Sequence, residues 1–161
     1  MLHDDLIAMC QHIKDKKPSL TVGIHTNGGA RKIEWWKSLA RALPKNHCVH
    51  FAIDGLEDTH HLYRVGTKYE TVIKNASAFI SAGGRAEWTF IKFKHNEHQV
   101  EECQQRATDL GFEKFVLKNS SRFLVEPKYD VLDAQGKLTH LLEPPSETTI
   151  KFLPKEVINS Y

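Results

Sequence analysis

The chain has 161 residues, of which 40% are hydrophobic and 26% are charged, as is typical of a single soluble globular domain. This length excludes a complete eight-stranded (β/α) barrel, which needs roughly 250 residues. The net charge is only +2, which excludes the strongly basic surface of a dedicated nucleic-acid binder.

The sequence also carries no signal for a membrane or for secretion. Its uncharged apolar runs are only a few residues long, far short of the roughly 20 that a spanning helix requires. The first five residues are acidic, whereas a secretory signal is basic and then apolar. We therefore expect a cytoplasmic protein that has neither a membrane nor a nucleic acid among its partners.

Four segments place apolar residues at the spacing of an amphipathic helix, and four β-like runs alternate with them. The helical segments are 4–17, 31–43, 69–82 and 97–110, and the β-like runs are 20–26, 47–54, 85–93 and 114–118. Helices that connect successive strands predict a parallel sheet with right-handed crossovers. Because each helix has a single apolar stripe, we expect an α/β fold with four parallel strands in sequence order and helices on one face only.

The pattern changes after Asn119. Segments 123–125 and 129–132 read as strands, Asp133 to Gly136 as a turn and 137–142 as the returning strand. This predicts a C-terminal β-hairpin, and 149–152 and 154–161 are expected to add a short strand and a short helix. We divide the chain into a main unit, 1–122, and a C-terminal unit, 123–161.

The first predicted element is a helix with no strand before it. Every later helix connects two strands, and a parallel sheet is normally covered on both faces. The sequence is therefore expected to be the middle of a larger domain, with a preceding segment or a complementary chain supplying the neighbouring strands.

The metal-binding residue types show no ligand spacing. Cys10, Cys48 and Cys103 are far apart and form no C-x2-C pair, so they are expected to be core residues and not cluster ligands. The chain has ten histidines, but His47 and His50 should face opposite sides of a strand. No metal site is predicted.

Candidate binding residues follow two of the strands, at the edge of a parallel sheet where ligands bind. Asn27 and Gly28 form either a turn whose backbone N–H groups approach a ligand or simply a tight strand-to-helix turn. Asp54 ends the second strand, and the long connection 55–68 carries Arg64. Arg64 has the geometry to clamp a carboxylate, and a surface ion pair with Glu57 or Asp58 is the alternative.

Three short stretches carry a resemblance to a known family. They are Leu2-His3-Asp4-Asp5-Leu6, Thr26-Asn27-Gly28, and Phe51-Ala52-Ile53-Asp54-Gly55 followed by His60 and Tyr63-Arg64. Over residues 1 to 122 the chain resembles radical S-adenosylmethionine (radical SAM) enzymes, particularly those with a SPASM-type extension. That resemblance implies a partial (β/α) barrel of six strands, of which this chain would supply the third to the sixth.

The resemblance also implies two cofactors, S-adenosylmethionine and a 4Fe-4S cluster. Asn27 and Gly28 would line the cofactor cleft, Asp54 would lie near the ribose or the carboxylate, and Arg64 would engage the carboxylate. The family's C-x3-C-x2-C loop is absent, and Ala52 stands where relatives often have a serine that contacts the cofactor. The chain alone is therefore expected to be inactive, with no catalytic residue assigned and with a peptide or a small molecule as the substrate of the intact enzyme.

Two other classes of protein remain open at this point. One is a small flavodoxin-like α/β module that binds a phosphate or a nucleotide at Asn27-Gly28-Gly29 without catalysis. The other is a non-catalytic remnant or partner subunit whose missing strands come from another chain.

Overall fold

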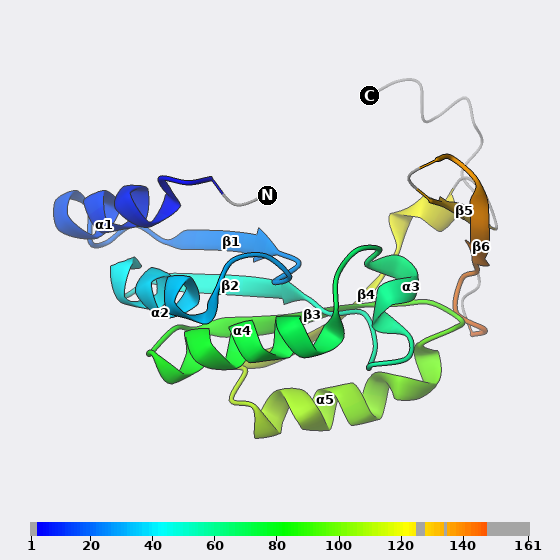
Figure 1. The fold of residues 1–161 in the computed structure, drawn as a ribbon. Coiled ribbons are helices and arrows are strands. Elements are labelled where there is room, and N and C mark those ends of the chain that lie inside the picture. The colour runs from blue at the N-terminus through cyan, green and yellow to red at the C-terminus, as the bar shows by residue number, and fades with distance from the viewer. Residues whose placement is uncertain (1–2, 125–127, 134, 148–161) are drawn as a thin grey trace.

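A computed structural model describes residues 3–124, 128–133 and 135–147. Four parallel strands form one sheet in the order β1-β2-β3-β4 (Figure 1). The strands are β1 (Val22–Thr26), β2 (His47–Ala52), β3 (Ala86–Lys92) and β4 (Lys114–Asn119). The predicted α/β class and the sequential strand order are confirmed.

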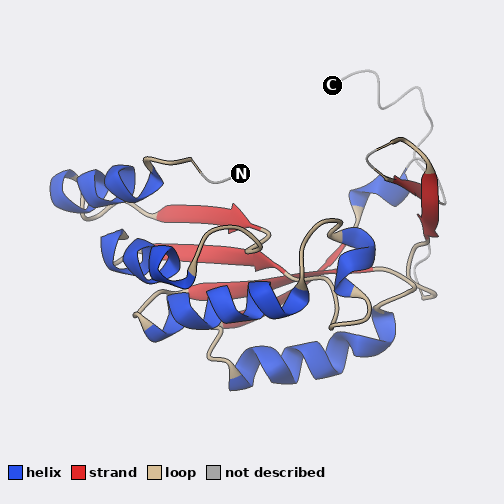
Figure 2. Cartoon of the chain, in the orientation of Figure 1, coloured by secondary structure: helices blue, strands red, loops and turns tan. Residues whose placement is uncertain are grey.

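The long helices all lie on one side of this sheet, in a single layer (Figure 2). They are α1 (Leu6–Lys16), α2 (Ile33–Ala42), α4 (Tyr69–Ser81) and α5 (Val100–Asp109). The predicted helix 97–110 is split, because its first turn is the 3-10 helix η1 (Glu97–Gln99). The connection 55–68 contains a one-turn helix, α3 (His60–Tyr63).

An aromatic cluster holds the helices against the sheet. The ring of Trp36, on α2, lies 5.2 Å from that of Phe51 on β2 and 6.4 Å from that of Phe79 on α4, measured between centroids. Helices α2 and α4 therefore cover the same face. A doubly wound, flavodoxin-like sheet would place helices on both faces, so this packing favours the arc of a barrel.

The other face of the sheet is not covered by any of the described helices. Along β2, buried residues alternate with partly exposed ones, because successive side chains of a strand point to opposite faces. His47, Val49 and Phe51 face the helices, which leaves Cys48 and His50 on the opposite side. We call this second side the bare face.

The C-terminal unit forms the predicted hairpin, from β5 (Tyr129–Leu132) and β6 (Leu138–Leu142), at the end to which the sheet strands point (Figure 1). The prediction of a strand at 123–125 is wrong for Phe123, which lies in the 3-10 helix η2 (Ser121–Leu124). This turn buries Phe123 against Phe93, with ring centroids 5.7 Å apart, in a small second core. The elements expected at 149–152 and 154–161 lie outside the described residues.

In the described part of the chain, none of the helices has both the length and the apolar composition needed to cross a membrane.

Candidate functional site

Asp54 follows directly after β2, at the edge where the parallel strands end, which we call the carboxyl edge. Its side chain is fully buried. The Arg64 Nε–H donates to Asp54 Oδ2 at 2.5 Å, and the Ile91 backbone N–H donates to Asp54 Oδ1 at 2.6 Å. Both carboxylate oxygens are thus occupied by donors from the connection after β2 and from β3.

Backbone groups of the same residue complete the junction. The Asp54 N–H donates to His60 Nδ1 at 3.3 Å, and its carbonyl accepts a hydrogen bond from Asn96 Nδ2 at 3.1 Å. Asn96 Nδ2 also donates to the Ile91 carbonyl. The Asn96 side chain therefore ties the residue after β2 to the end of β3, and the His60 ring ties the same residue to Thr67 in the connection.

Burial raises the pKa of Asp54, while the Arg64 guanidinium and the Ile91 N–H oppose that rise by stabilising the carboxylate. Two charge-assisted donors at these distances stabilise the carboxylate form of the buried group. Because Asp54 has no exposed surface, its role in this geometry is to position Arg64.

Arg64 lies partly exposed at the carboxyl edge. Its guanidinium is stacked 4.8 Å above the ring of Tyr63. Together with Arg122 and Tyr129 it lines a cavity of about 410 Å³ next to β5, and the Arg122 guanidinium lies 4.4 Å from the Tyr129 ring. Two guanidinium groups beside two aromatic rings suit a ligand that combines a carboxylate with a flat ring.

The turn at Asn27 and Gly28 is closed by its own hydrogen bonds. The Gly28 N–H donates to Thr26 Oγ1, and the Gly29 N–H donates to the exposed Asn27 side chain. Gly28 itself is buried, and its carbonyl accepts a hydrogen bond from Asn75 Nδ2 at 2.7 Å. Since both N–H groups have partners, this turn does not have the open cradle of a phosphate-binding loop.

The four predicted residues come together only in part. Asp54 and Arg64 are in direct contact. Asn27 and Gly28 are connected to them only indirectly, through Gly29 and Thr67. Gly29 lies against Thr67, whose hydroxyl donates to the Arg64 carbonyl at 2.7 Å and hydrogen-bonds His60 Nε2 at 2.9 Å.

Sequence reasoning missed most of the supporting residues at this edge. The sequence pattern indicates no role for Asn96, and it places Gln99 only within the helix predicted at 97–110. The Gln99 side-chain oxygen accepts from the Leu56 N–H at 3.0 Å and from the Thr59 hydroxyl. His60 is marked in the sequence by its place in the long connection 55–68 and in the stretch that carries the resemblance, but neither predicts its hydrogen bonds to Asp54 and Thr67. A buried amide is visible in sequence only when its partner backbone is known, so no local signal identifies Asn96 or Gln99.

The three cysteines do not converge. The predicted core position is confirmed for Cys10 and Cys103, which are buried between sheet and helices. It is wrong for Cys48, which is only partly buried because its place in β2 directs it to the bare face. Burial raises the pKa of Cys103 to about 12 and, together with the nearby carboxylates of Glu87 and Glu113, that of Cys48 to about 11. These residues do not fit a 4Fe-4S cluster, which is held by converging thiolates.

Comparison with solved structures identifies the fold. SuiB of Streptococcus suis bound to S-adenosylmethionine matches with a TM-score of 0.59 and 22% identity, over 79% of this chain and 28% of SuiB. SuiB bound to its precursor peptide SuiA matches with a TM-score of 0.58 and 20% identity, over 74% of this chain and 26% of SuiB. The enzyme anSMEcpe with bound AdoMet and Cp18Cys peptide matches with a TM-score of 0.57 and 15% identity, over 82% of this chain and 37% of anSMEcpe.

The chain therefore has the fold of one part of these proteins and spans little more than a quarter of SuiB and of the order of a third of anSMEcpe. No family model and no curated protein matches the sequence.

The tight packing of the turn after β1 predicts a difference between two glycine substitutions. Gly28 and Gly66 both have positive φ angles, +68° and +81°. An added Cβ at Gly28 would lie 2.8 Å from Val72 and 2.9 Å from Phe51, whereas at Gly66 it would meet nothing within 4 Å. Gly66→Ala should cost about 1–2 kcal/mol of backbone strain, and Gly28→Ala should cost about 1–3 kcal/mol more because it overpacks the core. Urea denaturation measures both, and equal losses would contradict the packing described here.

A second prediction concerns pH. Burial lowers the pKa of His60 from 6.5 to about 4, so the folded protein favours the neutral ring. The unfolded chain takes up a proton below pH 6.5 while the folded chain does not, so stability is complete above pH 6.5 and is lost as the pH falls toward 4. The loss from this residue should be on the order of 3 kcal/mol.

Urea denaturation of wild type and His60→Asn between pH 7 and pH 4.5 tests this. The variant should show a shallower decline, although not a flat one, because burial also lowers the pKa of His95 to about 4. His12→Asn, which replaces an exposed histidine, is the matched control and should decline as steeply as wild type. An unchanged slope in His60→Asn would show that His60 does not titrate in this way.

Proposed function

We propose that this chain is the S-adenosylmethionine-binding arc of a radical SAM enzyme, in which Arg64 engages the carboxylate of the cofactor. The observation that carries the proposal is the buried Asp54–Arg64 pair at the carboxyl edge of a four-stranded arc. Its fold is that of proteins solved with bound S-adenosylmethionine, which supports this cofactor.

Each residue of the proposed site has a binding or positioning role. Asp54 fixes the direction of the Arg64 side chain. The partly exposed guanidinium of Arg64 would donate hydrogen bonds to the carboxylate of S-adenosylmethionine. Arg122 and the ring of Tyr129 flank the same cavity and would contact the flat adenine. The exposed side chain of Asn27 would border the cleft at the end of β1.

The resemblance implies a 4Fe-4S cluster, which would supply the electron that splits S-adenosylmethionine into methionine and a 5′-deoxyadenosyl radical for hydrogen abstraction. Because the three cysteines of this chain do not fit such a cluster, we assign no step of that chemistry to its residues. The chain by itself binds the cofactor and does not cleave it. The structures of SuiB and anSMEcpe include bound peptides, which supports a peptide as the substrate of the intact enzyme.

The proposal predicts weak but specific binding of S-adenosylmethionine. Two or three charged hydrogen bonds contribute about 1.5–3 kcal/mol each, and after the cost of association they leave a dissociation constant of roughly 1 mM. Arg122→Ala and Arg64→Lys should both weaken binding. Lysine is chosen at position 64 because alanine would leave the buried Asp54 unpaired, at a cost of about 3–5 kcal/mol.

Ligand-observed NMR with S-adenosylmethionine measures these affinities. Arg41→Ala, which removes an exposed arginine of α2, is the matched control and should bind as wild type does. Binding that ignores both Arg64 and Arg122, or production of 5′-deoxyadenosine by this chain alone, would contradict the proposal.

A further inference from the structure

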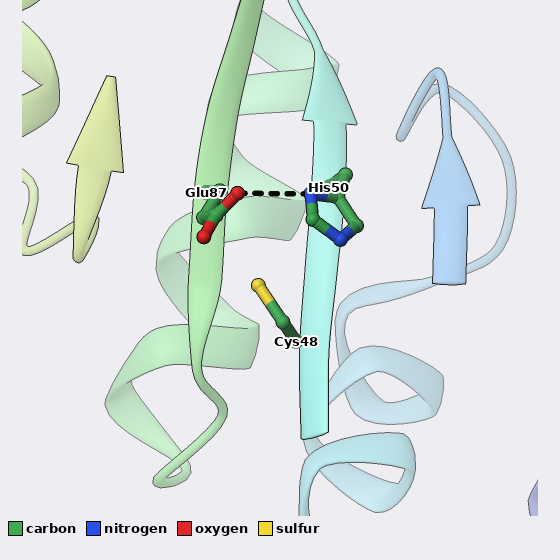
Figure 3. A group of neighbouring side chains, drawn as sticks. All are labelled: Cys48, His50 and Glu87. Carbon is green, nitrogen blue, oxygen red and sulfur yellow. Dashed lines mark ion pairs between the residues drawn. The ribbon is translucent and has the colours of Figure 1, made fainter. Parts of the chain in front are cut away.

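The bare face of the sheet carries a cluster of three metal-ligating side chains, Cys48, His50 and Glu87 (Figure 3). One ligand atom from each lies within 4.8 Å of the other two. Among the described residues, no other group of three His, Cys, Asp or Glu side chains meets this distance. We propose that these residues bind a divalent transition-metal ion, with zinc as the preferred one.

Strand register brings the three side chains together. Cys48 and His50 are two residues apart on β2 and therefore point to the same face. His50 is the register partner of Glu87 on the parallel strand β3, which places the Glu87 side chain on that face as well. His50 Nδ1 and Glu87 Oε2 are 3.0 Å apart (Figure 3).

The ligand spacing is close to that of a loaded site. Metal–ligand bonds of about 2.0–2.3 Å in a tetrahedron place the ligand atoms roughly 3.3–3.8 Å apart. His50 Nδ1 and Glu87 Oε2, which are 3.0 Å apart, would separate slightly on binding. The Cys48 sulfur, which lies within 4.8 Å of the other two ligand atoms, would approach them by about 1 Å at most.

The chemistry of the three ligands favours a divalent ion of intermediate softness. A thiolate, an imidazole nitrogen and a carboxylate are the ligand types that zinc uses. On binding, the Cys48 thiol gives its proton to the solvent, and the resulting thiolate and the Glu87 carboxylate balance the two positive charges of the ion. Three protein ligands leave a fourth position for water or another ligand.

Neighbouring side chains hold the ligands in place. The ring of His25, on β1, stacks on His50 with centroids 4.3 Å apart and an interplanar angle of 10°. Lys114 Nζ lies 3.6 Å from Glu87 Oε1, so it contacts the carboxylate oxygen that does not face His50. Glu87 and His50 are only 14% and 23% exposed, so the site is shielded although no described helix covers it.

Cobalt titration tests the proposal on the whole chain, because a thiolate bound to Co²⁺ gives a charge-transfer absorption in the near ultraviolet. Metal-free wild type should develop this band with one equivalent of Co²⁺, and Zn²⁺ should abolish it by displacement. Cys48→Ser should remove the band. His50→Gln and Glu87→Gln should each weaken Co²⁺ binding by about tenfold or more, since changes even outside the ligand set cost about 10–100-fold.

Cys103→Ala, which removes a core thiol, is the matched control and should leave the band and the affinity unchanged. Circular dichroism verifies that each variant is folded, and the near-isosteric glutamine variants keep the test valid if Cys48→Ser does not fold. Absence of the band in wild type, its persistence in Cys48→Ser, or equal affinity in all variants would overturn the proposal. The assay uses metal alone, so its outcome is independent of S-adenosylmethionine binding.

Discussion

The buried carboxylate of Asp54 is the interaction on which the carboxyl edge depends. An ionised acid with no access to water is tolerated only when donors occupy its oxygens, and here Arg64 and the Ile91 N–H do so. One donor comes from the connection after β2 and the other from β3. Satisfying a single buried charge therefore links the end of β2 to β3 and fixes the direction of Arg64, which directly follows α3.

The second constraint is that the described helices cover one face of the sheet. The aromatic core of Trp36, Phe51 and Phe79 occupies the helix side, so every other residue of β2 belongs to that core. The other residues of β2, among them Cys48 and His50, lie outside that core on the bare face, where polar side chains are tolerated. The helix side and the bare face of β2 thus carry different side chains because successive residues of a strand point to opposite faces.

The fold could be predicted from sequence because its signals are local and repeated. Each predicted helix has one apolar stripe, and helices connect the four successive strands, which indicates the class, the strand direction and the strand order. The site was less accessible. Asp54 is indicated by its charge at a strand end and Arg64 by its position in the long connection, but their pairing depends on the path of that connection. The metal-ligating group on the bare face was missed because Glu87 meets His50 through the β2–β3 register, and register cannot be read from either strand alone. The strand prediction is wrong for Phe123 because its apolar side chain is buried by a tertiary contact with Phe93, which the local sequence pattern does not show.

Amide hydrogen exchange in Asp54→Asn measures most directly whether one buried charge organises the carboxyl edge. Removing the charge should accelerate exchange at Ile91 and in residues 55–67 more than in α2 and α4, because only the edge loses its anchor. Glu113→Gln, which breaks the exposed pair with Arg85, is the control and should leave the exchange at the edge unchanged. Uniform acceleration across the whole chain, or unchanged exchange at Ile91, would contradict the role assigned to Asp54.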